Sequence, residues 1–401
     1  MKPIFLCLFV FLFFAGHTQK LLKGVVLDAE MNTAVSGASV FFNNTSMGTT
    51  ANTEGQFQLY LPAGKYDLIV SSIGYETHNQ TIIPGEAADF LTIKLKLKAP
   101  ELETVVIEPY EKNGWEKWGQ FFLENFIGTS AYARDCEIKN TGALRFRNSK
   151  KTNELTAFAL EPLIIENKAL GYTIRYQLES FSYNFSTHYL LCLGYPFFEP
   201  MKGGRARQKR WEQKRREVYF GSIMHFMRSV YRNQLTEEGF EVRALKKIEN
   251  AEKKRVKEAR QNNMKKTPMP DGRIMLSEIN KDSAAYYNKI MQQPDSYDMA
   301  EKNPLPGDNI AYAVDSTTAG LAFNNYLLII YTKGMAPPEY RQRFPKNSTG
   351  MMSQVTLTHQ RPVEIQANGS YYNPTDLISL GYWAWSEKIA TMLPFDFSTK
   401  K

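Results

Sequence analysis

The sequence has 401 residues, a formal net charge of +8 at pH 7, 43% hydrophobic residues and 13% aromatic residues. This composition excludes a disordered chain, and the length is sufficient for two or three domains with well-developed cores. The charge is uneven, because residues 201–266 carry 20 Lys and Arg against eight Glu and no Asp.

Residues 1–18 have the pattern of a secretory signal peptide. Lys2 precedes an unbroken apolar run, Ile4–Phe14, and small and polar residues follow it. This run is shorter than the 20 or so residues that a membrane-spanning helix needs. We therefore predict an exported protein, in the periplasm, at the outer membrane or outside the cell. Cleavage is expected between Gly16 and Gln19, and no integral membrane segment is expected after it.

Residues 22–98 are predicted to form a small β-sandwich. Apolar and polar residues alternate over Phe57–Leu61 and again over Tyr66–Val70, which is the period of half-buried strands. Glycines at positions such as Gly55 and Gly74 separate the strands and allow tight turns. The segment contains no set of residues that could carry out catalysis, so we expect it to hold or bind something.

The motifs of this segment occur in a fixed order: Gly24-x-Val26-x-Asp28, Gly37-Ala38-x-Val40, Gly55-x-Phe57-x-Leu59, Leu61-Pro62-x-Gly64-x-Tyr66 and Gly74-Tyr75. The order and spacing resemble the carboxypeptidase regulatory-like domain, a transthyretin-like or prealbumin-like β-sandwich. The family also occurs at the N-terminus of TonB-dependent receptors and of uncharacterised bacterial envelope proteins. The remaining sequence, including the terminal GYWAW, resembles such envelope proteins as well, and that resemblance implies no activity.

Residues 101–401 are predicted to form an α+β domain with an antiparallel sheet, either as one domain or as two. Trp115, Trp118, Phe122 and Phe126 have helical spacing. Strands are expected around these ranges: 143–146, 155–160, 172–178, 181–193, 273–279, 310–314, 325–331 and 353–358. A hairpin is expected over 363–372, turning on Asn368-Gly369. The whole protein is thus predicted to be mainly β, with a seven-stranded-type sandwich before the α+β domain.

The basic segment 203–266 is predicted to contain one long amphipathic helix. Trp211, Tyr219, Ile223, Met227 and Val230 recur at helical spacing, and Gly239 is a plausible end. Beyond Gly239, residues 244–266 are polar on all sides and are expected to form a solvated helix or a loop. A solvated face is the simplest interpretation, and contact with an anionic surface is the functional alternative. The export signal argues against nucleic acid as a partner.

The sequence provides no recognisable catalytic or metal-binding motif, so we predict no enzymatic activity, no metal and no cofactor. None of the five histidines has Glu three residues later, as the zinc carboxypeptidase motif requires. His225, on the predicted helix, is interpreted as a packed or surface residue. Cys136 and Cys192 remain after signal removal and either form a disulfide or stay as unpaired thiols. A cryptic hydrolase in 101–401 stays an alternative.

Aromatic residues near the C-terminus are the best candidates for binding. On a strand, Trp383 and Trp385 share one face and Tyr382 lies on the other. Such rings stack on sugars or anchor protein interfaces, and the simpler alternative is that they belong to the core. We therefore predict a non-enzymatic envelope protein with a binding, scaffolding or assembly role. Its partners would be outer-membrane or periplasmic proteins or a polysaccharide, and the alternative is a carbohydrate-binding accessory of an outer-membrane transporter.

Overall fold

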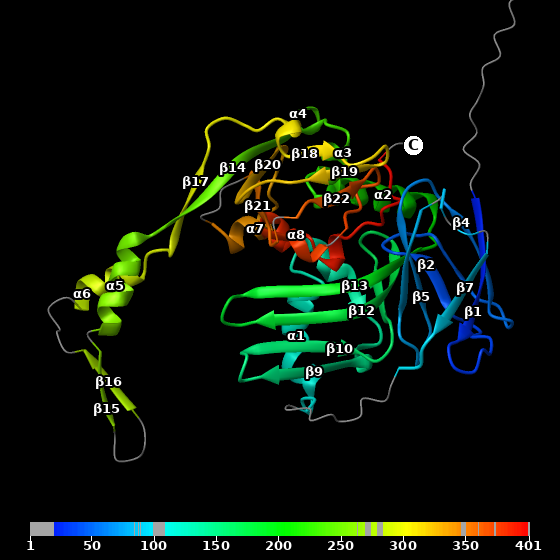
Figure 1. The fold of residues 1–401 in the computed structure, drawn as a ribbon, viewed down its shortest axis with the longest axis horizontal. Helices are drawn as coiled ribbons and strands as arrows, with labels where there is room; N and C mark the ends of the chain where they lie inside the picture. The colour runs from blue at the N-terminus through cyan, green and yellow to red at the C-terminus, as the bar shows by residue number, and fades with distance from the viewer. Residues whose placement is uncertain are drawn as a thin grey trace, which may run out of the picture. The chain divides into compact units, whose positions relative to one another are not determined.

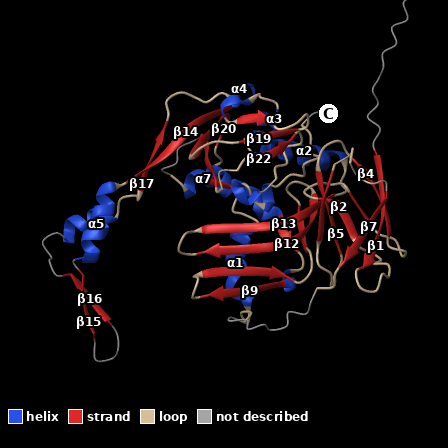
Figure 2. Ribbon diagram, viewed as in Figure 1, coloured by secondary structure: helices blue, strands red, loops and turns tan. Residues whose placement is uncertain are grey.

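The computed structural model describes residues 20–83, 85–86, 88, 90–98, 109–262, 264–268, 274–278, 284–345, 350–359, 361–372 and 374–399, with the backbone alone described for 264–268 and 274–278. The predicted signal peptide and its cleavage site lie outside these residues. The described residues divide into two compact units. The first comprises segments 1–120, 137–167 and 171–202, and the second comprises 121–136, 168–170 and 203–401. Strands predominate in the first unit, whereas the second unit combines strands and helices (Figure 2).

The first unit begins with the predicted sandwich of seven strands. Their bounds are β1 Lys20–Asp28, β2 Ser39–Phe42, β3 Gly48–Thr50, β4 Gln56–Leu61, β5 Tyr66–Ser71, β6 His78–Ile82 and β7 Phe90–Leu95. One sheet has the order β4-β1-β7 and the other β3-β2-β5-β6. Strands β1 and β7 are parallel, and every other neighbouring pair is antiparallel. The predicted sandwich is therefore confirmed.

The sequence motifs of the sandwich have clear structural roles. Gly24 lets β1 approach β7, because a Cβ at this position would lie 2.5 Å from the carbonyl oxygen of Leu91. The carboxylate of Asp28, 1% exposed, accepts hydrogen bonds from the backbone N–H groups of Glu30 and Met31, each at 2.8 Å. It also accepts one from the hydroxyl of Tyr75 at 3.1 Å. These backbone hydrogen bonds, that of Met31 first, lower the pKa of Asp28.

A third sheet, of six strands, completes the first unit. Its strands are β8 Cys136–Ile138, β9 Leu144–Ser149, β10 Glu154–Ala159, β11 Leu163–Asn167, β12 Tyr172–Asn184 and β13 Tyr189–Pro200. The order is β8-β11-β12-β10-β9, in which β11 pairs with the first half of β12 and β10 with its last residues. Strand β13 pairs with β12 along its whole length. Alternate residues of β12 are buried as predicted, including Tyr172, Ile174 and Tyr176. Helix α1, Gly114–Phe126, lies at the division between the two units and confirms the predicted helix.

The second unit is built around a five-stranded antiparallel sheet, β17-β14-β20-β21-β23. A three-stranded sheet, β18-β19-β22, packs with it around a shared core. Phe226 and Met227 of a helix and Ile329 and Val355 of the larger sheet meet in this core. The strands are β14 Phe240–Glu249, β15 Met264–Pro268, β16 Ile274–Glu278, β17 Ser296–Ala300, β18 Ala311–Ala313, β19 Thr318–Leu321, β20 Tyr326–Met335, β21 Gly350–Leu357, β22 Val363–Gln366 and β23 Leu377–Gly381.

The helices of the second unit are short. They are α2 Arg205–Tyr219, α3 Ile223–Tyr231, α4 Leu235–Glu238, α5 Ala251–Asn262, α6 Ala284–Met291, α7 Pro338–Arg343 and α8 Tyr382–Ser386. Short 3-10 helices at Ala131–Asp135 and Ile389–Thr391 belong to the same unit. Within the described ranges, no helix has both the length and the apolar character that spanning a bilayer requires.

The predicted long basic helix is wrong in its continuity. It is divided at Phe220–Ser222 and again at residues 232–234, and the last piece ends at Gly239, which adopts a left-handed conformation with φ 94° as the sequence suggested. Residues 240–249, predicted in part as a solvated helix or loop, form strand β14. This strand forms because its first half pairs with β20 and its second half with β17. Helix α5, Ala251–Asn262, follows and is mostly exposed, so the expected solvated helix is correct for these residues. Strand β15 begins at Met264, and the segment 203–266 is therefore a set of separate elements.

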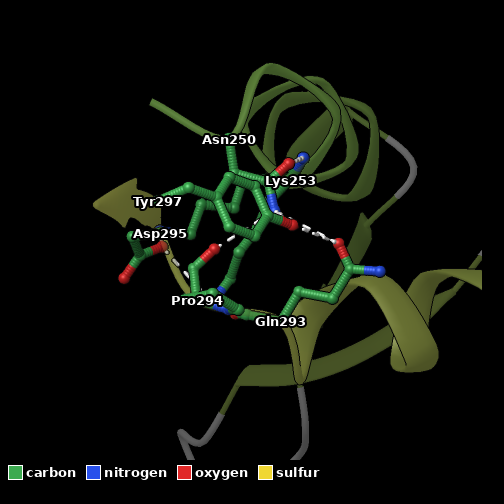
Figure 3. A network of polar contacts seen from close by, with 7 residues as sticks. Asn250, Lys253, Gln293, Pro294, Asp295 and Tyr297 are labelled. Carbon is green, nitrogen blue, oxygen red and sulfur yellow. Dashed lines mark hydrogen bonds and ion pairs between the residues drawn. The ribbon is translucent and has the colours of Figure 1, made fainter. Parts of the chain in front are cut away.

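Strand β14 continues beyond β20 and pairs with β17 up to the start of α5 (Figure 1). A polar network fixes this junction (Figure 3). The side-chain amide of Asn250, which is 5% exposed, donates to the carbonyl oxygen of Pro294 at 3.1 Å and to the hydroxyl of Tyr297 at 3.0 Å. The ammonium of Lys253 donates to the carbonyl oxygen of Gln293 and lies 3.3 Å from the carboxylate of Asp295. The two segments that enter and leave α5 and α6 are thereby held together.

Candidate ligand-binding cavity

A cavity of about 320 Å³ lies entirely within the second unit. Its walls come from segments that are distant in sequence: the 3-10 helix at 131–135, the end of α2, the end of β20, the start of α7, and α8 with the residues that follow it. Cavities of this size, mainly apolar with a few convergent polar groups, are the usual form of a small-molecule site. We therefore treat it as the candidate functional site.

The break between α2 and α3 shapes one side of the cavity. Gly221 has φ 82°, a conformation that favours glycine, and a Cβ there would lie 2.6 Å from Cε of Met351. Its carbonyl oxygen accepts a hydrogen bond from Nε1 of Trp383 at 2.8 Å. Its N–H donates to Nδ1 of His225 at 3.1 Å. This residue therefore joins the helix break to the core, and it turns Phe220, 40% exposed, toward the cavity.

His225 is a packed residue, which is one of the two alternatives that the sequence left open. It is 2% exposed and is surrounded by the rings of Tyr219, Phe220, Phe240 and Tyr331. Because Nδ1 accepts the N–H of Gly221, Nε2 carries the proton and donates to the carboxylate of Glu238 at 3.1 Å. Burial lowers the pKa of His225, so the neutral ring is the favoured form.

Glu387 places a carboxylate in the cavity at the start of α3. Its Oε1 accepts a hydrogen bond from the backbone N–H of Ile223, the first residue of that helix, at 3.0 Å. Ser222 caps the same helix, since its Oγ accepts from the N–H of His225 at 3.1 Å. The carboxylate of Glu387 faces the cavity, where surrounding protein displaces water and raises its pKa to about 7.

Two further carboxylates line the cavity. Glu217 of α2 accepts a hydrogen bond from the hydroxyl of Tyr132 at 2.9 Å and one from the side-chain amide of Gln213 at 3.0 Å. Burial, together with the carboxylate of Glu217, raises the pKa of Tyr132, so its hydroxyl keeps the proton. Glu339 lies in the first turn of α7. The opposing cation in the lining is Lys333, whose ammonium donates to the carbonyl oxygen of Glu237.

The three aromatic candidates are placed differently by the structure. They lie on the short helix α8, so the predicted strand is wrong: Gly381, with φ 73°, ends β23 and starts the helix. Trp383 is 2% exposed and packs against Phe226, so it belongs to the core. Tyr382 and Trp385, each 9% exposed, are also buried, but both contribute to the cavity wall. Their role in binding stays a prediction.

The structure brings together residues that the sequence analysis did not select. Tyr132, Glu217, Glu339 and Glu387 lie in four separate segments, and no motif or spacing connects them. The aromatic residues near the C-terminus are the one sequence feature that indicates this site, and they form only one wall of the cavity. Within the described ranges, no group of three or more His, Cys, Asp or Glu side chains is placed to hold a metal ion.

The remaining chemical candidates are the two cysteines. Both are free thiols, with Cys136 buried and Cys192 partly exposed. Burial raises the pKa of the Cys136 thiol to about 12. The thiol of Cys192 lies 3.8 Å from the hydroxyl of Tyr176. The unpaired alternative of the sequence analysis therefore describes this structure.

Comparison with known proteins identifies the N-terminal module. Residues 22–107 match the family model described as "CarboxypepD_reg-like domain", which confirms the resemblance to the carboxypeptidase regulatory-like domain. No curated protein matches the chain. Among solved structures, a protein of unknown function from Bacteroides fragilis NCTC 9343, described as membrane-associated, is similar at 10% sequence identity. The alignment covers 86% of this chain and 93% of that chain with a TM-score of 0.17, a value too low to support any inference.

Proposed function

We propose that this is an exported, non-enzymatic envelope protein with a binding role, and that the cavity of the second unit is its binding site. The observation that carries the proposal is the cavity itself, of about 320 Å³, with aromatic and methionine side chains in its walls and three carboxylates among them. The sandwich would hold the protein in place or contact a partner.

The binding role is tested by blocking the cavity. Ala131 is exposed and lies at its edge, so Ala131→Trp fills space without altering the core. Ala251→Trp is the matched control, since Ala251 is exposed at the start of α5 and is not a lining residue. Ligand-observed NMR with a mixed panel of sugars, amines, carboxylic acids and amphiphiles should identify binding that Ala131→Trp removes and Ala251→Trp retains. A panel with no such member contradicts the proposal.

Export and the absence of catalysis need separate measurements. Cell fractionation with N-terminal sequencing should find the mature protein in the envelope, beginning between residues 17 and 20. A cytoplasmic protein with residues 1–18 intact would contradict export. Hydrolysis of peptides or glycans by the purified protein at an ordinary turnover rate would contradict the non-enzymatic role and favour the hydrolase alternative.

Carbohydrate binding is the second candidate function. The observation that favours it is that Tyr382 and Trp385 border the cavity, where aromatic rings can stack on sugar rings. A glycan array should then show binding that is lost in Trp385→Ala with folding intact. An array without any bound glycan would contradict carbohydrate binding and favour another class of ligand.

An anionic surface is a further candidate partner. Arg205, Arg207, Lys209 and Arg210 of α2 are all exposed, so this helix presents consecutive turns of positive charge. Each basic residue near an anionic membrane contributes about 1 kcal/mol to attraction. Co-sedimentation with phosphatidylserine vesicles, but not with phosphatidylcholine vesicles, would support this contact. Equal sedimentation with both would contradict it.

A further inference from the structure

The charge of the cavity lining is unbalanced. Glu217, Glu339 and Glu387 contribute three carboxylates from three different elements, against the single cation Lys333. The ammonium of Lys333 is already hydrogen-bonded to the carbonyl oxygen of Glu237, which is not a lining residue. Within the described part of the chain, none of the three carboxylates forms an ion pair with Lys or Arg. At pH values above about 7, where the carboxylate of Glu387 is ionised as well, the cavity therefore has an excess of negative charge.

These carboxylates are accessible. As whole residues, Glu217 and Glu387 are exposed and Glu339 is partly exposed, and all three line the cavity, where a ligand would contact them. The hydrogen bonds that they accept, from Tyr132 and Gln213 to Glu217 and from Ile223 to Glu387, come from neutral groups. An anionic ligand would add a further negative charge to this group, whereas a cationic ligand would neutralise part of it.

The walls between the carboxylates are aromatic. The lining includes the rings of Tyr132, Phe220, Tyr331, Tyr382 and Trp385. Aromatic faces attract cations by about 0.5–2 kcal/mol, depending on desolvation, and they also pack against an apolar ligand body. Within the described residues the carboxylates are not arranged as a metal-binding group, so an inorganic cation fits the cavity less well than an organic one.

We propose that the cavity binds a small organic cation, namely an amine, guanidinium or quaternary ammonium group on an apolar body. This inference depends on the proposed binding function and specifies its ligand class. The aromatic walls contact the apolar body, and the carboxylates of Glu339 and Glu387 neutralise the charge. Met335, 66% exposed at the mouth of the cavity, and Pro337 add apolar contact for a ligand that reaches outward.

Three probes of matched size and different charge test this inference. They are 2-phenylethylamine, 2-phenylethanol and 3-phenylpropionate, titrated against the mature full-length protein by isothermal calorimetry. The amine should bind at least about tenfold more tightly than the alcohol, since charge attraction and cation–π contact together are worth about 1.4 kcal/mol. The carboxylate should not bind. Equal affinity for the amine and the alcohol would overturn the inference and leave the proposed binding function intact.

Charge-neutralising variants locate the effect. Glu339→Gln and Glu387→Gln keep the size of the side chain and one acceptor oxygen but remove the charge, so each should weaken amine binding about fivefold to tenfold and leave alcohol binding unchanged. Glu339→Gln is the decisive variant, because Glu387 also caps α3. Glu258→Gln, an exposed residue of α5 outside the cavity, is the control. Unchanged amine affinity in Glu339→Gln and Glu387→Gln overturns the inference.

The failure of the inference differs from the failure of the proposed function. If a neutral sugar binds and Ala131→Trp removes that binding, the cavity is a binding site and the cation is the wrong ligand class. If no member of the panel binds in a way that Ala131→Trp affects, both the binding function and the ligand class are rejected.

Discussion

Asp28 in the sandwich and Glu387 in the cavity are both carboxylates that accept backbone N–H groups, but the donors lie at very different distances along the chain. Asp28 accepts from residues two and three positions later. Glu387 accepts from Ile223, 164 residues away in sequence. A carboxylate that closes its own turn forms a recognisable local motif, whereas one that caps a distant helix has no sequence signature. The sandwich can therefore be predicted from local sequence patterns, whereas the cavity depends on contacts between residues that are far apart in the sequence.

The largest expected effect comes from removing the side chain of Trp383, which packs in the core beside the break between α2 and α3. Trp383→Ala should lower the free energy of unfolding by about 3–5 kcal/mol, because it leaves a cavity and removes the hydrogen bond to the carbonyl oxygen of Gly221. Denaturant unfolding followed by circular dichroism measures the loss. Trp383→Phe, which keeps most of the ring, should cost less, and equal losses would show that the indole N–H contributes most.

Two glycines with similar backbone angles sharpen the comparison between the units. Gly74 in the sandwich has φ 86° and no atom within 4 Å of the position that a Cβ would take, so Gly74→Ala should cost about 1–2 kcal/mol from the backbone alone. Gly221 has φ 82° and a Cβ there would contact Met351 and Tyr331, which adds roughly 1–3 kcal/mol of overpacking. Thermal unfolding of the two variants should therefore rank Gly221→Ala as the less stable. The reverse ranking would contradict the close packing at the helix break.

The stabilities that Glu387 and Asp28 confer should respond oppositely to pH. The pKa of Glu387 is raised from 4.5 to about 7, so the folded state binds the proton more tightly and stability falls as pH rises through that range. Glu387→Gln should remove this loss, and its melting temperature should exceed that of the wild type at about pH 8 but not at about pH 4.

The corresponding sandwich variant is Asp28→Asn. The pKa of Asp28 is lowered below 3.8, so its ionised form stabilises the fold above that value and this stabilisation is lost as pH falls through the lowered pKa. The variant should be less stable than the wild type at about pH 7, and the difference should shrink in acid. A difference independent of pH for either residue would show that its charge is not involved.

The smallest expected effect concerns thiol reactivity. The Cys136 thiol, with a pKa of about 12, has very little thiolate at neutral pH, and it is buried. Iodoacetamide labelling with mass spectrometry should therefore modify Cys192 in the folded protein and both residues after denaturation. Rapid labelling of Cys136 in the folded state would contradict its burial.

The sandwich could be predicted from the sequence because its determinants are local. Alternation over Phe57–Leu61 and the turn glycine Gly55 each act within one strand or turn, and Asp28 needs only its next residues. The hairpin on Asn368-Gly369 was predicted for the same reason, and the structure confirms it through a hydrogen bond from the N–H of Gln366 to the carbonyl oxygen of Ser370 at 2.9 Å.

The cavity could not be predicted because its determinants are distant in sequence. The helical spacing from Trp211 to Val230 continues across Gly221, and only the side chains of Tyr331 and Met351 show why the chain breaks there. The second half of strand β14 is polar and gains its conformation from pairing with β17. The aromatic cluster was noticed, but its helical conformation depends on the end of β23 at Gly381.

The parallel pairing of β1 with β7 has a mechanical consequence. The pairs run from Lys23 with Phe90 to Asp28 with Leu95, so the start of the first strand and the end of the last lie at opposite ends of the same pairing. Tension between residues 20 and 98 would pull these strands past each other and load their hydrogen bonds together instead of one after another. A tether built in this way should rupture in a single high-force step in an optical trap, and gradual peeling at low force would exclude it.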